Sequence, residues 1–468
     1  MAILPKSQSK GFLFLRGLLS AGFLFSARAV AVIYQLRYAE HAFGPSYGGL
    51  IALLNQVTFY ILLAEMGLAA ATTSLLFEPV HRKDLVWVKA LMASMSSDVR
   101  KILLLLGPCS VAMSFVLAFW LRKQVPFKVA LISVLLTSVA ALLTFSALPY
   151  QSHFNANDRV STRNIVLGFG FAGKVSLGVV LARVTHSFFG LPLGVAIVGV
   201  FELLIQRYLV NSRLGDDVIT PQLIAEAHKA IRHRAKFVLA HRIGSLFGYQ
   251  SDYIILLMSS SLALLGYYAH YQYIYAGILS FTLAVGGTVT ARIARRQIGI
   301  GQEGYAALYR KTSYLITGGA VVSGSAFYLL AGPVVHLLYR NKTADPLAVL
   351  LFSILLMLNI YKMNDDLWID TTGTYHKGYL LPLFEAASYV TLGLLLVRDL
   401  HMSGILYAGI ITNAVFSVIF KSVVIGSGVM RNQVVSIVWI KLLNLALIGA
   451  IFYCVVRLAQ MFQGMHAI

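Results

Sequence analysis

An acidic residue, Asp252, interrupts the apolar stretch GYQSDYIILLM at residues 248–258. A charged side chain in the hydrocarbon of a bilayer costs roughly 2.5–3.5 kcal/mol on insertion scales, and such residues usually face a protein interior or water and serve a function. Asp252 therefore has two interpretations. It forms an ion pair that locks helices together, or it binds and releases a proton when its surroundings change. The sequence leaves both open.

Basic residues also occur within apolar stretches. Arg28 and Lys174 lie far from the ends of their stretches, which favours a water-filled interior, whereas Arg16 and Arg292 lie near ends from which they could reach lipid headgroups. A guanidinium suits a phosphate because it stays charged and forms two parallel hydrogen bonds with the oxygens. We therefore predict a cationic site for a phosphate group. Its candidate residues are Arg28, Lys174, Arg242, Arg16 and Arg292.

Further acidic residues lie within the apolar stretches. Each either pairs with a basic residue or binds and releases an ion, and pairing is the preferred interpretation for Asp370 and Glu385, which lie near loop ends. The candidates for coupling or structural roles, besides Asp252, are Glu65, Asp365 and Asp366.

Tyrosines gather in the stretch YYAHYQYIY at residues 267–275, near the outer end of a predicted membrane span. Tyrosine at that depth is typical of the aromatic belt at a membrane surface. The rings could instead stack on sugar faces. The candidates for sugar stacking are Tyr267, Tyr268 and Tyr271.

The elements that must position these residues are membrane helices. The chain has 468 residues, of which 58% are hydrophobic and 12% charged, and its mean hydropathy is +0.76, which is typical of an integral membrane protein. Apolar stretches near the ~20 residues that span a bilayer recur along the whole chain. We predict thirteen spans, within a range of 12–14, at roughly 11–36, 48–78, 102–121, 127–153, 164–184, 188–211, 237–258, 262–293, 314–338, 347–371, 379–397, 404–426 and 438–460.

The net charge of +20 would suit a nucleic-acid-binding protein, but the placement of the charges indicates otherwise. Lys and Arg are concentrated in alternate connectors, above all 79–101 and 212–236. This asymmetry follows the positive-inside rule, so the N-terminus is predicted to be cytoplasmic and no nucleic-acid partner is expected.

No pattern in the sequence suggests catalysis or a cofactor. Cys and His lack metal-ligand spacing, and no Walker motif occurs. The stretch GFGFAGK at residues 168–174 has the spacing G-x-G-x-x-G, but it lies within a predicted span and lacks the preceding strand of a dinucleotide site. Close helix packing through its glycines is the better interpretation. We expect a protein that is not an enzyme and that holds no metal or cofactor.

The chain divides at its widest interruption. We predict an N-terminal six-helix bundle at 1–211, a cytoplasmic linker at 212–236, a C-terminal six-helix bundle at 237–426 and an extra helix within 427–468. From Pro221 the linker has apolar and basic residues on opposite faces of a helical pattern, which favours an amphipathic helix on the inner leaflet, with a basic loop as the alternative.

The two halves show weak similarity where they begin. SARAVAVI at 26–33 aligns with QSDYIILL at 250–257, which sets Arg28 opposite Asp252. We therefore predict that the two charges lie at equivalent depths and pair when the interior between the halves is empty.

Three stretches carry a resemblance to a known family. FGPSYGGLIALLNQVTFYILLAEMGLAAATTSLL at 43–76 contains Gly-Pro, Tyr-Gly and an acid followed by Gly-Leu, and the Asp252 region continues to Gly266 and Tyr267. Together with MSGILYAGIITNAVFSVIF at 402–420, these stretches resemble the Wzx-like polysaccharide flippases of the multidrug/oligosaccharidyl-lipid/polysaccharide exporter superfamily. The family commonly has twelve or fourteen spans, so a count of thirteen departs from it.

The resemblance implies a polytopic all-α protein of the bacterial cytoplasmic membrane, with two six-helix bundles in a flippase/MATE-like arrangement around a central cavity. Its implied substrate is an undecaprenyl-diphosphate-linked oligosaccharide, moved across the membrane by alternating access for polysaccharide synthesis. Its implied partners are membrane lipid, the lipid-linked glycan, a polysaccharide polymerase and chain-length proteins.

Other functions remain as alternatives. A multidrug-type cation antiporter of the same superfamily would favour an acidic or aromatic cavity, and a peptidoglycan-precursor flippase would also bind a diphosphate. A membrane glycosyltransferase or polymerase usually carries a sizeable catalytic loop outside the membrane, which the short outer connectors here do not provide. The sequence leaves the glycan, the coupling ion and the oligomeric state open.

Overall fold

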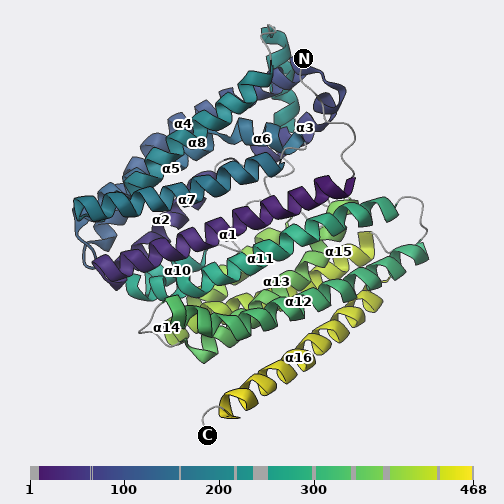
Figure 1. The fold of residues 1–468 in the computed structure, drawn as a ribbon. Helices are drawn as coiled ribbons and strands as arrows, with labels where there is room; N and C mark the ends of the chain where they lie inside the picture. Colours follow the sequence, from purple (N-terminus) through teal and green to yellow (C-terminus); the bar gives the residue numbers. More distant parts are fainter. Residues whose placement is uncertain are drawn as a thin grey trace. The chain divides into compact units, whose positions relative to one another are not determined.

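The structure, a computed structural model, describes residues 10–63, 65, 67–157, 160–214, 219–233, 235, 251–297, 302–338, 344–372, 380–428 and 433–465 (Figure 1). Within these ranges the regular elements are all helices, which confirms the predicted all-α class. Eight of the described helices are long and apolar enough to cross a membrane. The chain is therefore an integral membrane protein by fold and composition, and the count of thirteen spans stays a prediction.

The chain divides into two compact units. The first unit comprises Met1–Arg242 and Ser261–Gly266, and the second comprises Ile243–Ser260 and Tyr267–Ile468. The predicted boundaries of the two bundles stay a prediction. Each unit has a separate set of packed helices, and the two are described in turn.

In the first unit, long helices pack in pairs. Helix α7 packs against α1 and α8, and α5 packs against α2, α4 and α8. The labelled helices of this unit are α1 (Lys10–Phe43), α2 (Pro45–Leu63), α3 (Leu68–Arg82), α4 (Leu85–Leu121), α5 (Phe127–Ser146), α6 (Leu148–Ala156), α7 (Val160–Thr185) and α8 (Gly190–Leu214).

Two predicted spans of this unit are each divided into two helices. The stretch 48–78 forms α2 and α3, with Gly67 between them at φ 75°, a left-handed conformation that glycine adopts without steric cost. The stretch 127–153 forms α5 and α6, and Pro149 occupies the first turn of α6, where its missing N–H does no harm. Apolar composition alone does not reveal either break.

Residues 221–233 of the predicted linker form a helix. Ala227 and Ile231 are completely buried in the core of the first unit, in one hydrophobic cluster with Leu91 and Met95 of α4. His228 Nδ1 lies 3.1 Å from a carboxylate oxygen of Asp98, also on α4. The apolar face of this helix thus packs against protein, and its position on the inner leaflet stays a prediction.

The second unit is arranged around α13. Helix α13 packs against α12 and α14. Of the residues in its most apolar 18-residue stretch, 72% are buried, the largest share among the eight described candidate spans. The elements are α10 (Asp252–Ser259), α11 (Leu262–Gln297, whose first turn belongs to the first unit), α12 (Gln302–Leu338), α13 (Pro346–Thr372), α14 (Leu381–Val415), the π-helical turn η2 (Phe416–Phe420), α15 (Lys421–Gly428) and α16 (Val434–Met465).

Helix α14 covers most of the predicted span 379–397 and the first part of the predicted span 404–426. A sharp kink separates the two parts of the helix. His401 has φ 48° and ψ −124°, which is not helical. A Cβ at Gly404 would lie 2.4 Å from the carbonyl oxygen of Leu396, so glycine permits the close approach of the backbones around the kink.

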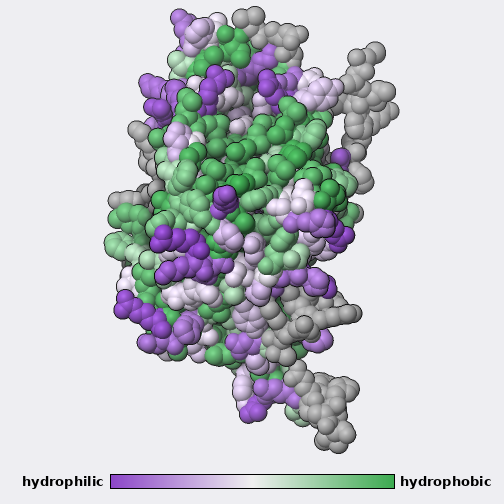
Figure 2. Space-filling view, turned by 90° about the vertical axis from the view of Figure 1, so that its left-hand side faces the viewer, coloured by the Kyte–Doolittle hydropathy of each residue, from purple (hydrophilic) through white to green (hydrophobic). Residues whose placement is uncertain are grey.

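The predicted C-terminal helix is present as α16, which packs against α12 and α15. Its outer side chains include Trp439 and Leu443, which are 63% and 64% exposed, as expected of residues that face lipid. Figure 2 shows a broad hydrophobic area on one face of the molecule. Large exposed apolar surfaces of this kind are typical of membrane-embedded proteins.

Candidate functional site

Two of the predicted phosphate-binding residues meet on one aromatic ring in the first unit. The guanidinium carbon of Arg28 on α1 lies 5.4 Å from the ring centroid of Phe171 on α7, and the Nζ atom of Lys174 lies 5.3 Å from the same centroid. Both distances are within the range of cation–π contacts. Arg28 is exposed and Lys174 is partly buried. We call Arg28, Phe171 and Lys174 the cationic cluster.

Lys174 is paired with an acid from the neighbouring helix. Its Nζ atom lies 2.6 Å from Glu202 Oε2 on α8, and the Glu202 side chain is only 6% exposed. The amide of Gln206 donates a hydrogen bond of 3.3 Å to the other carboxylate oxygen. The charge of Lys174 is therefore compensated by Glu202, and Arg28 supplies the other positive charge of the cationic cluster.

The glycines of GFGFAGK lie where α7 contacts α1 and α8. A Cβ at Gly168 would lie 2.5 Å from the Phe23 ring on α1, and a Cβ at Gly170 would lie 2.9 Å from Glu202 Oε2. Gly173 has more room, since its Cβ would lie 3.5 Å from Val198 on α8. The predicted packing role of this stretch is confirmed, and Gly170 makes space for the acid that binds Lys174.

The other predicted cationic residues are not brought into this cluster by described contacts. Arg16 is exposed in the first half of α1. Arg242 and the side chain of Arg292 lie outside the described part of the chain. Glu65 is half-buried in the turn between α2 and α3, where its carbonyl accepts a hydrogen bond from the N–H of Leu68.

Asp252 begins α10 in the second unit and is buried, with 6% of the residue exposed. Its two carboxylate oxygens accept hydrogen bonds from the hydroxyl groups of Tyr268 on α11 and Tyr389 on α14. Among the residues that the structure describes, no basic group lies within ion-pair distance of Asp252. The predicted pairing with Arg28 joins residues of different units and stays a prediction.

Of the three tyrosines predicted to stack on sugars, two lie in the protein core and Tyr267 is partly buried. Tyr268 and Tyr271 are completely buried, and the Tyr271 ring stacks on Phe352 with centroids 5.7 Å apart. The hydroxyls of Tyr267 and Tyr271 are 2.7 Å apart, and the backbone N–H of Asp345 donates to the Tyr271 hydroxyl at 2.9 Å. These rings hold α11 against α13 in this structure, and a sugar-stacking role stays a prediction.

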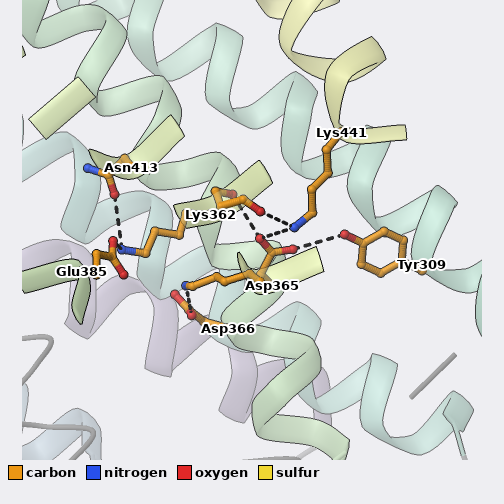
Figure 3. Close-up of polar contacts among 9 residues, drawn as sticks. Tyr309, Lys362, Asp365, Asp366, Glu385, Asn413 and Lys441 are labelled. Atoms are coloured by element: carbon orange, nitrogen blue, oxygen red, sulfur yellow. Dashed lines mark hydrogen bonds and ion pairs between the residues drawn. The ribbon is translucent and has the colours of Figure 1, made fainter. Parts of the chain in front are cut away.

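The second unit also contains three buried lysines that sequence reasoning missed. Lys362 pairs with Glu385 on α14, Lys421 on α15 pairs with Asp366, and Lys441 on α16 lies 2.8 Å from Asp365 (Figure 3). Because Lys362, Asp365 and Asp366 all belong to α13, these pairs tie the central helix to three neighbours. The signal was available, since each lysine lies within a predicted span and Lys362 precedes Asp365 by three residues.

The acids therefore differ in what they can do chemically. Asp365, Asp366 and Glu385 each have a lysine partner, and the preferred interpretation of Glu385 as a paired acid is confirmed. Asp252 has hydroxyl partners instead, which can remain bound to either the charged or the neutral carboxyl group. Protonation of Asp365, Asp366 or Glu385 would leave a lysine without its counter-charge. Of the second-unit candidates, Asp252 is thus the acid whose described partners allow it to gain or lose a proton without this cost.

In the described part of the chain, no group of three or more His, Cys, Asp or Glu side chains is arranged to hold a metal ion. Cys109 and Cys454 are both exposed free thiols.

No protein-family profile and no curated relative matches the sequence. Solved structures do match over almost the whole chain. They include the eukaryotic MATE transporter AtDTX14 (12% identity, 91% of this chain and 99% of that chain, TM-score 0.62) and the MATE multidrug transporter DinF-BH in complex with rhodamine 6G (13%, 94% and 100%, 0.62). A further match is a MOP superfamily transporter from Pyrococcus furiosus, for which a reversed polarity of the binding pocket suggests a different function (12%, 90% and 99%, 0.60).

At such low identity, these likenesses establish the fold alone. The chain has a MATE-like transporter fold, of the kind found in structures of the MOP superfamily.

Proposed function

We propose that the protein is an alternating-access flippase that moves an undecaprenyl-diphosphate-linked oligosaccharide across the bacterial cytoplasmic membrane, with the N-terminus in the cytoplasm. The observation that carries this proposal is the cationic cluster, in which an exposed Arg28 and a second cation, Lys174, both contact the Phe171 ring. The transporter fold supports a transport function, and the expected partners are membrane lipid, the lipid-linked glycan and the proteins of polysaccharide assembly.

The chemistry of the cationic cluster suits a diphosphate. A guanidinium that contacts an aromatic face can direct its edge at phosphate oxygens and form two parallel hydrogen bonds with them. The ammonium group of Lys174 supplies a second, compact charge, at about the same distance from the Phe171 ring as the Arg28 guanidinium. Glu202 neutralises Lys174 in the described structure, so a phosphate that approached this lysine would compete with a resident carboxylate.

A multidrug-type cation antiporter is the second candidate, because DinF-BH, a multidrug transporter, has a similar fold. A cationic substrate calls for an accessible acid, and Asp365, Asp366 and Glu385 are each bound by a lysine. Asp252 with its tyrosines is the one described feature that favours this alternative. The Pyrococcus furiosus transporter indicates that this fold is compatible with more than one pocket polarity. A peptidoglycan-precursor flippase would use the same cationic cluster, since its substrate also carries a diphosphate.

Binding of a short polyprenyl diphosphate tests the proposal. Farnesyl diphosphate should bind the purified protein, and Arg28→Ala should raise its Kd by about tenfold or more, since a hydrogen bond to a charged group contributes about 1.5–3 kcal/mol. Arg28→Lys should give an intermediate Kd because the two-bond geometry is lost. Arg37→Ala is the matched control, since Arg37 is also exposed on α1. Equal affinity of wild type and Arg28→Ala, or tight binding of rhodamine 6G alone, would favour the antiporter.

A further inference from the structure

The second unit encloses one ammonium group in a site lined by oxygen atoms. The Nζ atom of Lys441 lies 2.8 Å from Asp365 Oδ2 and 2.6 Å from the backbone carbonyl oxygen of Ser417. The Ser417 hydroxyl donates to Asp365 Oδ2 at 3.1 Å, and the Tyr309 hydroxyl donates to Asp365 Oδ1 at the same distance. Lys441 and Tyr309 are completely buried, and Asp365 is 1% exposed.

The oxygens and the ammonium come from different parts of the chain. Tyr309 belongs to α12, Asp365 to α13 and Ser417 to the π-helical turn η2, whereas Lys441 belongs to α16. Turns of the π type are rare and occur frequently at functional sites. In this case the turn directs both the hydroxyl and the carbonyl of one serine at the same place. The oxygen atoms around Asp365 and Lys441 therefore come from three elements, and the ammonium group comes from a fourth.

Apolar side chains border part of this site, and the ion pair of Lys421 and Asp366 lies close enough to act on the charge of Lys441. Tyr309, Trp368 and Ile437 belong to one buried hydrophobic cluster, and the Trp368 indole N–H is already bound to Thr312. In such surroundings a carboxylate without a counter-charge is strongly unfavourable. Some cation must accompany Asp365, and carboxylate, carbonyl and hydroxyl oxygens are the ligands that hard inorganic cations prefer.

We propose that the Asp365 carboxylate and the Ser417 carbonyl form a monovalent-cation site whose resident cation is the ammonium group of Lys441, with Tyr309 holding the other carboxylate oxygen. The lysine is a tethered substitute for a free ion, so shortening it converts the site into one that binds Na⁺, K⁺ or a small amine from solution. The inference is independent of the proposed substrate. It also assigns a role to α16, which supplies the ammonium group that neutralises Asp365.

The test is the thermal stability of the purified full-length protein in salts of equal ionic strength. Lys441→Ala should lose on the order of 5 °C of apparent Tm in choline chloride, because choline is too large to enter a buried site. NaCl, KCl or methylammonium chloride should restore most of that loss in a saturable manner. Wild type should have the same apparent Tm in all four salts.

Two variants control for general salt effects. Lys441→Ala/Asp365→Asn removes both charges and should not respond to the choice of cation. Lys421→Ala removes a buried lysine whose partner, Asp366, has a 38% exposed side chain, so water can solvate the remaining carboxylate and no selective rescue is expected. Selective rescue confined to Lys441→Ala supports the tethered-cation site.

Several outcomes would overturn the proposal. One is an equal loss of apparent Tm for Lys441→Ala in all four salts. Another is a similar rescue of the apparent Tm of Lys421→Ala or of the double variant by Na⁺, K⁺ or methylammonium. Cells contain K⁺, so Lys441→Ala should accumulate in the membrane as well as the double variant does, and its absence there would also contradict the proposal. Saturable stabilisation of the wild type by Na⁺ or K⁺ that is absent from Asp365→Asn would show that Lys441 does not fill the site.

Discussion

Lys174 and Glu202 form a 2.6 Å ion pair between α7 and α8, and the missing side chain of Gly170 leaves the space in which the carboxylate lies. The Lys174 side chain is 12% exposed and that of Glu202 is 6% exposed, so each charge depends on the other for stabilisation. A change in how α7 packs against α8 should therefore alter the position and the charge balance of Lys174 in the cationic cluster.

The ion pair should show strong coupling in a double-mutant cycle. Glu202→Gln and Lys174→Met should each lower the free energy of unfolding by about 3 kcal/mol, because each leaves a mostly buried charge without its partner. The combined variant should lose clearly less than the sum of the two. Denaturant or thermal unfolding of the three variants measures this, and strictly additive losses would show that the pair contributes nothing.

A methyl group at Gly170 should displace the Glu202 carboxylate, since the added Cβ would lie 2.9 Å from Oε2. Gly173→Ala is the matched control on the same helix, because its Cβ would make an ordinary 3.5 Å contact with Val198. Gly173→Ala should be neutral or stabilising by up to ~1 kcal/mol, the usual gain of alanine over glycine within a helix. Gly170→Ala should be less stable than Gly173→Ala by about 1 kcal/mol or more. Equal stabilities would show that Glu202 moves aside without loss.

If Asp252 carries a coupling proton, neutralising it should affect transport more than folding. Its described partners are hydroxyl groups, so Asp252→Asn should then leave the protein folded and able to bind farnesyl diphosphate, while transport loses its dependence on a proton gradient. Asp365→Asn is the control, and it should lower the free energy of unfolding by about 3–5 kcal/mol because Lys441 loses its counter-charge. Unchanged gradient dependence in Asp252→Asn would exclude this residue as the proton carrier.

The predicted pairing of Arg28 with Asp252 has its own test. If the two residues pair in the empty state, Asp252→Asn/Arg28→Gln should recover much of the membrane abundance lost in either single variant. Abundance is measured by quantitative immunoblotting of isolated membranes. Additive losses, or full abundance of both single variants, would exclude a structural pair.

Topology can be measured by cysteine labelling. In a variant with Cys109 and Cys454 replaced by alanine, a cysteine at Lys229 should react with an impermeant maleimide only after the membrane is opened. Cysteines at Lys123 and Arg398 should react in intact cells. All three native residues are exposed in the structure. Labelling of position 229 together with position 123 in intact cells would contradict a cytoplasmic N-terminus.

The sequence alone predicted the helical class and the C-terminal helix, because apolar stretches of membrane length are a strong local signal. The break at Gly67 was missed, since a left-handed glycine changes the path of the chain without changing its hydrophobicity. The helix at 221–233 was recognised, but the surface it covers was not. An apolar stripe has the same pattern whether it contacts lipid or a protein core.

The candidate site was predictable in its residue types and less so in its contacts. Arg28 and Lys174 were identified by charge within apolar stretches, yet the ring they share, Phe171, looks like any other membrane phenylalanine in the sequence. The buried lysines of the second unit carried the same signal as Arg28 and Lys174, a charge within an apolar stretch, but their partners could not be predicted. Which lysine meets Asp365 and which meets Asp366 depends on how α15 and α16 pack, and sequence spacing does not contain that information.

The central claim, movement of a diphosphate-linked lipid by way of Arg28, is tested most directly by translocation in proteoliposomes. A fluorescent polyprenyl-diphosphate-linked sugar is incorporated in both leaflets, and a membrane-impermeant reductant bleaches the probe that reaches the outer leaflet. Wild type and Arg37→Ala should make nearly all of the probe accessible, and Arg28→Ala should be slower by about tenfold or more. Equal rates for wild type and Arg28→Ala, or wild-type uptake of rhodamine 6G without any movement of the lipid probe, would contradict the account.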